Sequence, residues 1–323
     1  MDLNEQFNIY LEKNNFSSYN PKELYEPLDY ILSLGGKRIR PLLTLMSCQI
    51  FSEDISAAFP AAYAIEIFHN FSLLHDDIMD KSALRRGQAT VHEKYNTNTA
   101  ILSGDVMLVY AYKYLNKVPS KVLAPVLSTF NSVAISVCEG QQMDMNFETT
   151  AKVSIDEYKR MIELKTSILL YGAMKIGALI GGATESESEL VAEFGKNMGI
   201  AFQMQDDFLD TYGKKAKLGK RIGGDILQNK KTYLVIKALE LADAETKTKL
   251  ENWLSTSSPV SQQATKIKNV TAIFNKLGIP NEMETIIKLY YNNAINCLNQ
   301  LKKPDQKKVQ LLDLLKSLMD REY

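Results

Sequence analysis

Apolar residues recur at intervals of three and four positions along most of the chain. Between residues 61 and 79, for example, Ile65 and Phe68 fall at helical spacing. Residues 155–179 and 190–209 show the same period and predict two more long helices. No segment sustains an alternation of apolar and polar residues, and no Asn-Gly or Asp-Gly pair joins two β-rich runs. The pattern therefore predicts an all-α fold.

Glycine and proline residues separate the predicted helices, at Gly35–Gly36, Pro119 and Gly181–Gly182. Residues 214–224 are basic and rich in glycine, residues 254–265 are polar, and both are expected to form surface loops. No repeat of fixed period is visible, but one acidic motif occurs twice, about 130 residues apart. We therefore expect a single large domain over residues 1–323, whose two halves each contribute an acidic helix.

The acidic motif has the form DDxxD. Asp76 and Asp80 belong to its first copy, in FSLLHDDIMD, and Asp206 and Asp210 to its second, in AFQMQDDFLD. Residues four apart share one helix face, so each pair brings two carboxylates together among Leu, Met and Phe, where repulsion and lost hydration call for a cation. Mg²⁺ prefers oxygen ligands and is commonly bound by one or two carboxylates plus substrate phosphates. We expect two such helices to bind Mg²⁺ with a diphosphate between them. A solvated acidic turn is the alternative for either motif alone.

Basic residues that could bind an anionic substrate accompany the acidic motifs. In GGKRIRP, residues 35–41, a glycine turn is expected to open a helix whose N–H groups favour phosphate, with Lys37 and Arg40 on one face. Arg85 and Arg86 follow the first acidic helix, and paired guanidinium groups suit two phosphates. The alternative for this pair is a helix C-terminus that favours positive charge.

Further candidates are weaker when taken singly. His69 lies seven residues before Asp76, two turns back on the same face, and could bind a ligand or be a satisfied core histidine. Gln203 lies three residues before Asp206, on the metal face. The remaining polar candidates are Lys165, Thr166, Lys220 and Lys230.

Composition narrows the class of partner and the compartment. The 38 basic residues balance 38 acidic ones, which argues against a nucleic-acid partner. The three cysteines match no zinc or CxxC spacing, so a reducing, cytoplasmic compartment is expected. No signal peptide is visible at the N-terminus. Ser167–Ala183 is the best candidate for a membrane span, but it is short and interrupted by Lys175, so we expect a buried core helix instead.

Together these segments resemble the trans-type polyprenyl synthetase family, the short-chain isoprenyl diphosphate synthases. The resemblance covers about two-thirds of the chain. The matching segments run in the family's order from Gly35 to Leu234: GGKRIRP, EIFHNFSLLHDDIMDKSALRRG, LSGDVML, EGQQMD, ELKTS, AFQMQDDFLD and GKRIGGDILQNKKTYL. The resemblance implies an isoprenoid synthase fold, with antiparallel helices around a central active-site cavity. Members of this family are usually homodimers. Ser167 departs from the pattern, because Gly or Ala is usual there.

The resemblance also implies a role for each residue that matches a motif. Isopentenyl diphosphate would be bound by Lys37, Arg40, His69 and Arg86. Three Mg²⁺ ions would be bound by Asp76, Asp80 and Asp206, with Asp210. The allylic diphosphate would be held by Arg85, Lys165, Thr166, Gln203, Lys220 and Lys230. The residues expected to act directly in catalysis are Asp76, Asp80, Arg85, Lys165, Asp206 and Lys230. The implied reaction condenses the two substrates and releases diphosphate.

Product length is expected to depend on what blocks the cavity below the metals. Phe71 and Ser72 lie five and four residues before Asp76. One helical turn rises about 5.4 Å, comparable with one isoprene unit, so an aromatic ring here should stop growth early. An aromatic at this position also suits short products in the family that the chain resembles. We expect fifteen or twenty carbons, that is farnesyl or geranylgeranyl diphosphate, with twenty favoured. The alternative is that Phe71 is an ordinary core residue.

Two other functions are compatible with parts of the pattern. A class I terpene cyclase would share the first acidic motif, but its second motif normally mixes Asn, Ser and Glu. A non-catalytic helical subunit of a prenyl synthase would usually have lost one acidic motif, whereas both are intact here.

Overall fold

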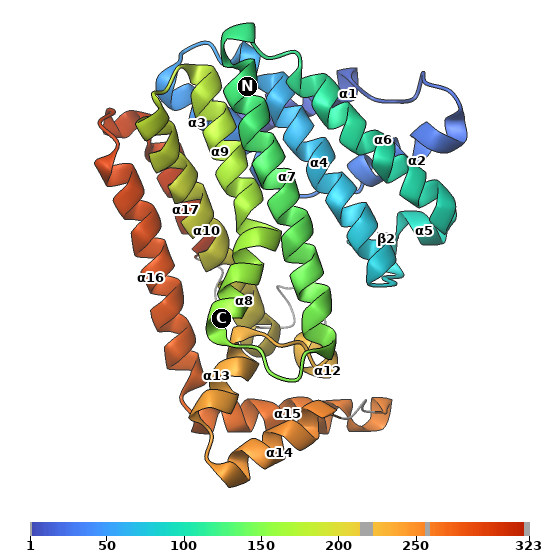
Figure 1. Ribbon diagram of the computed structural model, residues 1–323, viewed down its shortest axis with the longest axis vertical. Helices are drawn as coiled ribbons and strands as arrows, with labels where there is room; N and C mark the ends of the chain where they lie inside the picture. The colour runs from blue at the N-terminus through green and yellow to red at the C-terminus, as the bar shows by residue number, and fades with distance from the viewer. Residues whose placement is uncertain (1, 214–221, 256–258, 320–323) are drawn as a thin grey trace. The chain divides into compact units, whose positions relative to one another are not determined.

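The computed structural model describes residues 2–213, 222–255 and 259–319, and these are helical nearly throughout (Figure 1). The all-α prediction is therefore confirmed. The chain divides into two compact units, neither of which is continuous in sequence. Unit 1 comprises Met1–Ala134, Leu169–Ala192 and Leu301–Val309, and unit 2 comprises Ile135–Ile168, Glu193–Gln300 and Gln310–Tyr323.

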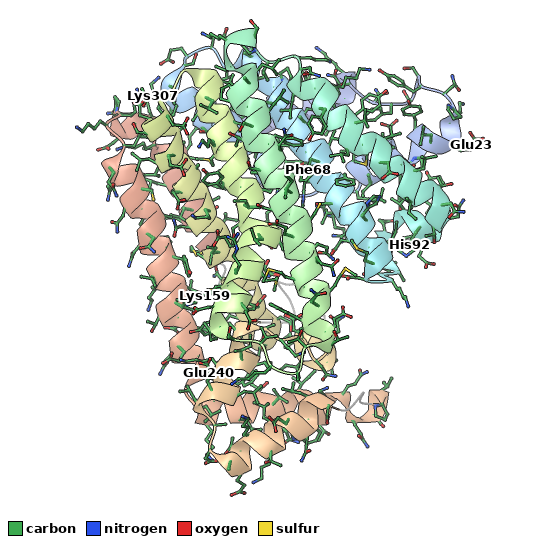
Figure 2. All side chains as sticks on the ribbon, viewed as in Figure 1. Glu23, Phe68, His92, Lys159, Glu240 and Lys307 are labelled. Atoms are coloured by element: carbon green, nitrogen blue, oxygen red, sulfur yellow. The ribbon has the colours of Figure 1, made fainter. Side chains whose placement is uncertain are left out.

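Unit 1 is built around α4 (Phe59–Met79) and α6 (Thr97–Leu115), which run side by side (Figure 1). Small residues such as Ala61, Ala64 and Gly104 are fully buried along these helices and allow their backbones to approach closely. Phe68 of α4 (Figure 2) packs edge-on against Phe130 at a ring distance of 5.2 Å. The other elements of this unit are α1 (Leu3–Lys13), α2 (Lys22–Ser33), α3 (Ile39–Phe51), η1 (Ser56–Ala58), α5 (Val91–Lys94), most of α9 (Ile168–Gly181), η3 (Asp305–Lys307) and the first parts of α7 (Ser120–Thr149) and α10 (Glu185–Tyr212).

Unit 2 contains the remaining parts of α7 and α10. Its other elements are α8 (Ile155–Ile162), η2 (Glu163–Ser167), α12 (Gly224–Leu227), α13 (Tyr233–Leu241), α14 (Ala244–Ser255), α15 (Val260–Lys276), α16 (Ile279–Gln300) and most of α17 (Val309–Met319). Its hydrophobic core joins Tyr158, Met204 and Phe208 to side chains of α13, α15 and α16. The core thus holds the second acidic motif on a helix that is packed along its apolar face.

Two loop predictions need correction. Most of residues 254–265 is helical, because α14 continues to Ser255 and α15 begins at Val260; the polar residues there lie on helix surfaces. The predicted loop 214–224 lies mostly outside the described residues. The breakers at Pro119 and Gly181–Gly182 are confirmed, since α7 begins at Ser120 and α9 ends at Gly181.

A short hairpin follows the first acidic helix and was not predicted. Strand β1 (Leu84–Arg85) pairs antiparallel with β2 (Gln88–Ala89). Arg86 and Gly87 form its turn with positive φ values of 53° and 77°. Two left-handed residues suit a two-residue hairpin, but Arg at the first position lacks the usual Asn or Asp signal. The alternative of a helix C-terminus at this arginine pair is therefore wrong.

The glycine turn before α3 is confirmed, with one correction. Gly35 and Gly36 have positive φ values of 77° and 129°, and Arg38 caps α3 with a φ of 49°. Because the helix begins at Ile39, Lys37 precedes it, and the expectation that Lys37 and Arg40 share one helix face is wrong.

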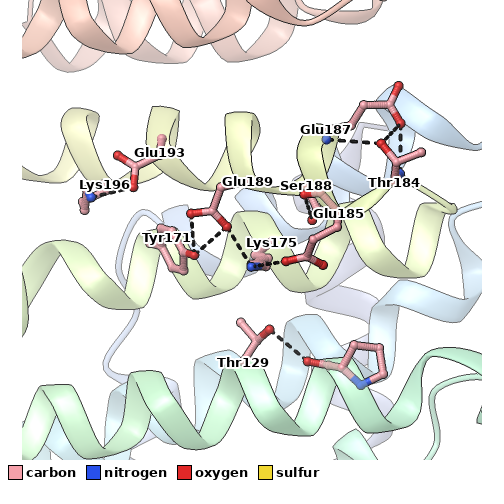
Figure 3. Close-up of polar contacts among 11 residues, drawn as sticks. Thr129, Tyr171, Lys175, Thr184, Glu185, Glu187, Ser188, Glu189, Glu193 and Lys196 are labelled. Atoms are coloured by element: carbon pink, nitrogen blue, oxygen red, sulfur yellow. Dashed lines mark hydrogen bonds and ion pairs between the residues drawn. The ribbon is translucent and has the colours of Figure 1, made fainter.

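The apolar run that includes Lys175 is largely a core helix. Over Ile155–Gly181, 67% of the most apolar window is buried. Lys175 Nζ lies 2.8 Å from Glu185 and 2.7 Å from Glu189, and Tyr171 donates a hydrogen bond to Glu189 (Figure 3). The lysine charge is therefore compensated by the protein. By length and apolarity alone, this stretch and Ser120–Thr149 could each cross a membrane, a test that core helices also pass.

Candidate active site

The first acidic motif ends α4, and its three aspartates differ in their surroundings. Asp77 is 3% exposed, and Arg85 donates to both of its carboxylate oxygens, at 2.6 and 2.8 Å. Asp76 is partly exposed, with Arg85 3.7 Å away, and Asp80 is exposed at the helix C-cap. The negative end of the helix dipole meets these carboxylates, which further favours a cation. Arg85 thus compensates chiefly the charge of the middle aspartate, while the outer two carboxylates are more accessible to solvent.

The second acidic motif, in the last two turns of α10, is built in the same way. Its middle aspartate, Asp207, is 7% exposed and accepts hydrogen bonds from Tyr158 and from Gln203 at 2.9 Å. Burial, followed by the nearby charge of Asp225, raises the pKa of Asp207 to about 7. The outer residues Asp206 and Asp210 are partly exposed, and Asp210 accepts the backbone N–H of Asp225 at 3.0 Å. In both motifs, therefore, the middle carboxylate is buried and the two outer carboxylates are accessible to solvent.

Neither motif forms a complete metal cage. In the part of the chain that the structure describes, no three His, Cys, Asp or Glu side chains are grouped so that they could hold a metal by themselves. Mg²⁺ commonly takes only one or two carboxylates from the protein and its remaining oxygens from water and substrate phosphates. The outer pairs fit an ion of that kind.

A cluster of cationic side chains lies between α3, α4 and the hairpin of unit 1; we call Arg38, Arg40, His69 and Arg86, with Glu66, the cation cluster. Arg38 forms an ion pair with Glu66, which is 3% exposed. Arg40 Nη1 lies 3.1 Å from His69 Nε2. A Cβ atom at Gly36 would lie 2.7 Å from Arg86 Nη2, so only glycine allows the guanidinium to lie there.

The electrostatics of the cation cluster favour an anion. Burial lowers the pKa of Arg40 to about 10, while Glu66 opposes this and Arg86 adds to it. Arg40 Nε is buried and has no hydrogen-bond partner within the described residues. Burial and then the neighbouring arginines hold the pKa of His69 well below its usual value, so the imidazole is neutral and Nε2 accepts from Arg40. One buried carboxylate balances three guanidinium groups only in part, and a phosphate would supply the missing charge.

The polar candidates of unit 2 form a second connected group. Lys165 and Thr166 lie in the π-helical segment η2. Lys165 Nζ is 2.5 Å from Asp144, and Thr166 donates to Gln203 at 3.4 Å. Gln203 in turn donates to Asp207, which links the group to the second acidic motif. Lys230 lies 3.6 Å from Asp225, and Lys220 lies outside the described residues.

Sequence reasoning missed four residues that organise these groups: Glu66, Asp144, Tyr158 and Asp225. Three of them stand in segments that carry the family resemblance, Glu66 in EIFHNF, Asp144 in EGQQMD and Asp225 in GKRIGGDIL. For Glu66 and Asp144 the signal was a charge in a predicted helix. Tyr158 gives no such signal, because a tyrosine at helical spacing resembles any core aromatic.

Phe71 and Ser72 lie on α4, one to two turns before Asp76. The Phe71 ring lies 4.8 Å from that of His75 and 5.5 Å from that of Phe68, and its side chain is partly exposed. Ser72 donates to the carbonyl of His69 at 2.8 Å. The ring is thus supported on both sides while one part of it stays accessible.

Comparisons with known proteins agree with this geometry. Residues 21–274 match a model of the polyprenyl synthetase family. A geranylgeranyl diphosphate synthase of Methanosarcina mazei is 43% identical over 68% of this chain and 68% of its own length. Relatives named geranylfarnesyl diphosphate synthase match as well, so the names of relatives do not decide product length.

Solved structures give the same result over nearly the whole chain. A crystal structure of a geranylgeranyl pyrophosphate synthase superposes with a TM-score of 0.94 at 41% identity, covering 99% of this chain and 98% of that one. The enzyme of that name from Corynebacterium glutamicum, solved with isoprenyl diphosphate and magnesium, gives a TM-score of 0.84 at 26% identity, covering 98% and 96%.

Proposed function

The chain belongs to the polyprenyl synthetase family, and from that premise we propose that it joins an allylic diphosphate to isopentenyl diphosphate and releases diphosphate. It is a prenyltransferase of the short-chain type. The observation that best supports this reaction is the shared construction of the two acidic motifs. In each, the middle aspartate is buried and paired, and the outer two are more exposed. Such pairs suit Mg²⁺ that shares its coordination with a substrate diphosphate.

We propose that the outer aspartates bind three Mg²⁺ ions, through Asp76, Asp80, Asp206 and Asp210. When bound, Mg²⁺ neutralises the charge that develops on the leaving diphosphate as the allylic C–O bond breaks. We propose that the protein adds cations and hydrogen-bond donors to the same group, from Arg85, Lys165, Thr166, Gln203, Lys220 and Lys230. Lys165 is held by Asp144 and Thr166 by Gln203, so both are oriented before substrate arrives.

Within the cation cluster, Arg40, His69 and Arg86 are proposed to bind isopentenyl diphosphate, together with Lys37. Neutral His69 accepts from Arg40 and so fixes the orientation of that guanidinium. The double bond of the bound substrate then attacks the allylic cation, and a proton is lost. We assign that proton to the released diphosphate. The residues of the protein contribute by positioning and by electrostatic stabilisation.

The remaining assignments concern the whole protein. One family model runs through both compact units, which supports a single polyprenyl synthetase domain over residues 1–323. We also propose that the enzyme is cytoplasmic and homodimeric. The exposed apolar residues Ile101, Leu102 and Val109 of α6 support a homodimer, since such side chains are rarely grouped on a monomer surface. Helix α7 supports the same proposal, because only 22% of its most apolar window is buried.

Val109→Asp is expected to convert the dimer to a monomer, because it places a charge in the proposed interface. Val109 is 65% exposed, so the substitution should leave the folded subunit intact. Light scattering after size exclusion should give 36.4 kDa for the variant and twice that for the wild type. Val260→Asp on α15, where the side chain is 82% exposed, is the matched control and should stay dimeric. A monomeric wild type would refute the proposal.

Phe71→Ala is expected to lengthen the product from twenty carbons to twenty-five or more. The ring packs against Phe68 and His75, so it can act as a rigid barrier that limits the length of the growing prenyl chain. Chromatography of the dephosphorylated products measures the length. Phe71→Tyr keeps the ring and should make the wild-type product. Equal product lengths from the alanine variant and the wild type would mean that Phe71 is only a packing residue.

Incubation of the pure protein with Mg²⁺ and each substrate tests the proposed reaction. Prenyl transfer predicts a longer prenyl diphosphate and released diphosphate only when isopentenyl diphosphate and geranyl or farnesyl diphosphate are both present. A hydrocarbon made from the allylic diphosphate alone would indicate a terpene cyclase. Absence of turnover with any primer would indicate a non-catalytic subunit. The primer that gives the highest kcat/KM also identifies the preferred allylic substrate.

A further inference from the structure

The helical run from Ile155 to Gly181 is interrupted by a single π-helical turn, η2, at Glu163–Ser167. Such turns are rare and occur mostly as one-turn insertions in α-helices, frequently at functional sites. This one carries Lys165 and Thr166, two of the residues assigned to the allylic diphosphate. Its presence needs a physical cause, because the residues ELKTS contain no proline or glycine that would break an α-helix.

Gly140 of α7 provides contact on one side of the π turn. A Cβ atom at Gly140 would lie 2.7 Å from Leu164 C and from Lys165 Cα, and closer still to Lys165 N. These are backbone atoms, so they cannot move aside as a flexible side chain would. The backbone of α7 therefore touches the backbone of the π turn only because residue 140 has no side chain.

Gly199 of α10 provides the matching contact on the other side. A Cβ atom there would lie 2.9 Å from both Cα and Cβ of Ser167, the last residue of the turn. Ser167 is fully buried, which explains why a small residue is needed at this position. The π turn is thus packed between two glycines that belong to different helices of unit 2.

Each flanking helix also binds a side chain of the π turn one helical turn beyond its glycine. Asp144, four residues after Gly140, lies 2.5 Å from Lys165 Nζ. Gln203, four residues after Gly199, accepts from Thr166 at 3.4 Å. Residues four apart share one helix face, so glycine and polar partner act together on the same segment. Backbone contact and side-chain contact fix the position of both residues of the turn.

We propose that Gly140 and Gly199 are positioning residues, which hold the π turn in the form that presents Lys165 and Thr166 together to the allylic diphosphate. The proposal rests on the proposed function, because it assigns that ligand to the turn. One residue fewer would restore a continuous α-helix and rotate the segment after the deletion by about 100° relative to the segment before it. Lys165 and Thr166 could then not keep both Asp144 and Gln203 as partners.

Gly140→Ala tests the proposal. We expect kcat/KM for the allylic substrate to fall about a hundredfold, since a displacement of about 1 Å at a positioned group can have that effect. KM for isopentenyl diphosphate should stay within about twofold of wild type, because the atoms nearest to a Cβ at Gly140 belong to Leu164 and Lys165 and not to the cation cluster. Gly172→Ala is the control, because the three atoms nearest to its Cβ would all belong to the Val133 side chain. It should lower the melting temperature while changing the kinetic constants for the two substrates alike.

Deletion of Glu163 keeps the test decisive if Gly140→Ala does not fold. The deletion removes the extra residue, so we expect a folded helical protein with no measurable affinity for an unreactive thiolo analogue of the allylic diphosphate. Wild-type affinity for this analogue in the deletion variant would overturn the proposal, as would a Gly140→Ala enzyme with unchanged kinetics. A wild type that binds the analogue but transfers no prenyl group would instead refute the proposed reaction.

Discussion

Asp76→Asn is expected to lower kcat about a thousandfold, the upper range for losing one electrostatic contact in a transition state. Asp76 belongs to the outer pair of the first acidic motif, and asparagine keeps its size while removing the charge that a Mg²⁺ ion needs. The buried pair between Asp77 and Arg85 stays intact, so the melting temperature should change little. Steady-state kinetics at saturating substrates and a range of Mg²⁺ concentrations measure the effect.

The control for this variant is Asp313→Asn, on the exposed face of α17, which should retain wild-type kcat. An Asp76→Asn enzyme with more than a tenth of wild-type activity would contradict a metal-binding role for that carboxylate. A loss of activity accompanied by unfolding would show that the residue acts in the fold instead.

Arg40→Met is expected to raise KM for isopentenyl diphosphate about a hundredfold, close to the combined strength of two hydrogen bonds to a charged group. The folded protein should be no less stable. Burial lowers the pKa of Arg40 to about 10, Glu66 opposes this shift and Arg86 adds to it, and Arg40 Nε lacks a partner in the described part of the chain. Methionine fills a similar volume without these penalties. Substrate kinetics and thermal unfolding together check the prediction.

Arg38→Met is the matched control, and its result should be the reverse. Arg38 is the ion-pair partner of buried Glu66, so its removal leaves a carboxylate without its counter-charge. Breaking such a buried pair destabilises a protein by about 3 to 5 kcal/mol. If Arg40→Met were the less stable variant, or weakened both substrates equally, the cation cluster would be structural and not a binding site.

The sequence predicted the helices well because their signal is local. A period of 3.6 residues over long apolar runs identifies α4, α9 and α10, and Gly181–Gly182 marks where α9 ends. Residues 254–265 were misassigned because their polarity suggested a loop, although polar residues also form exposed helix surfaces. The hairpin at Arg86–Gly87 was missed because an arginine with a positive φ stands where Asn or Asp is the usual signal of such a turn.

The sequence predicted which residues belong to the candidate site, but not which of them are buried and paired with other residues of the protein. Spacing placed the first and last aspartates of each motif on one face, but it could not show that Asp77 and Asp207 are buried and paired with Arg85 and Tyr158. Those partners come from other elements, so no local pattern encodes them. The π turn is hidden for the same reason, because the two glycines that pack against it, on α7 and α10, lie more than twenty residues away in sequence.

A crystal structure with Mn²⁺ and an unreactive thiolo analogue of the allylic diphosphate would test the central claim most directly. Anomalous scattering would locate each ion without ambiguity. We expect ions bound by Asp76 and Asp80 and by Asp206, all sharing oxygens of one diphosphate that also contacts Lys165. Ions and diphosphate confined to one acidic motif, with the other too distant to reach the same ligand, would contradict it.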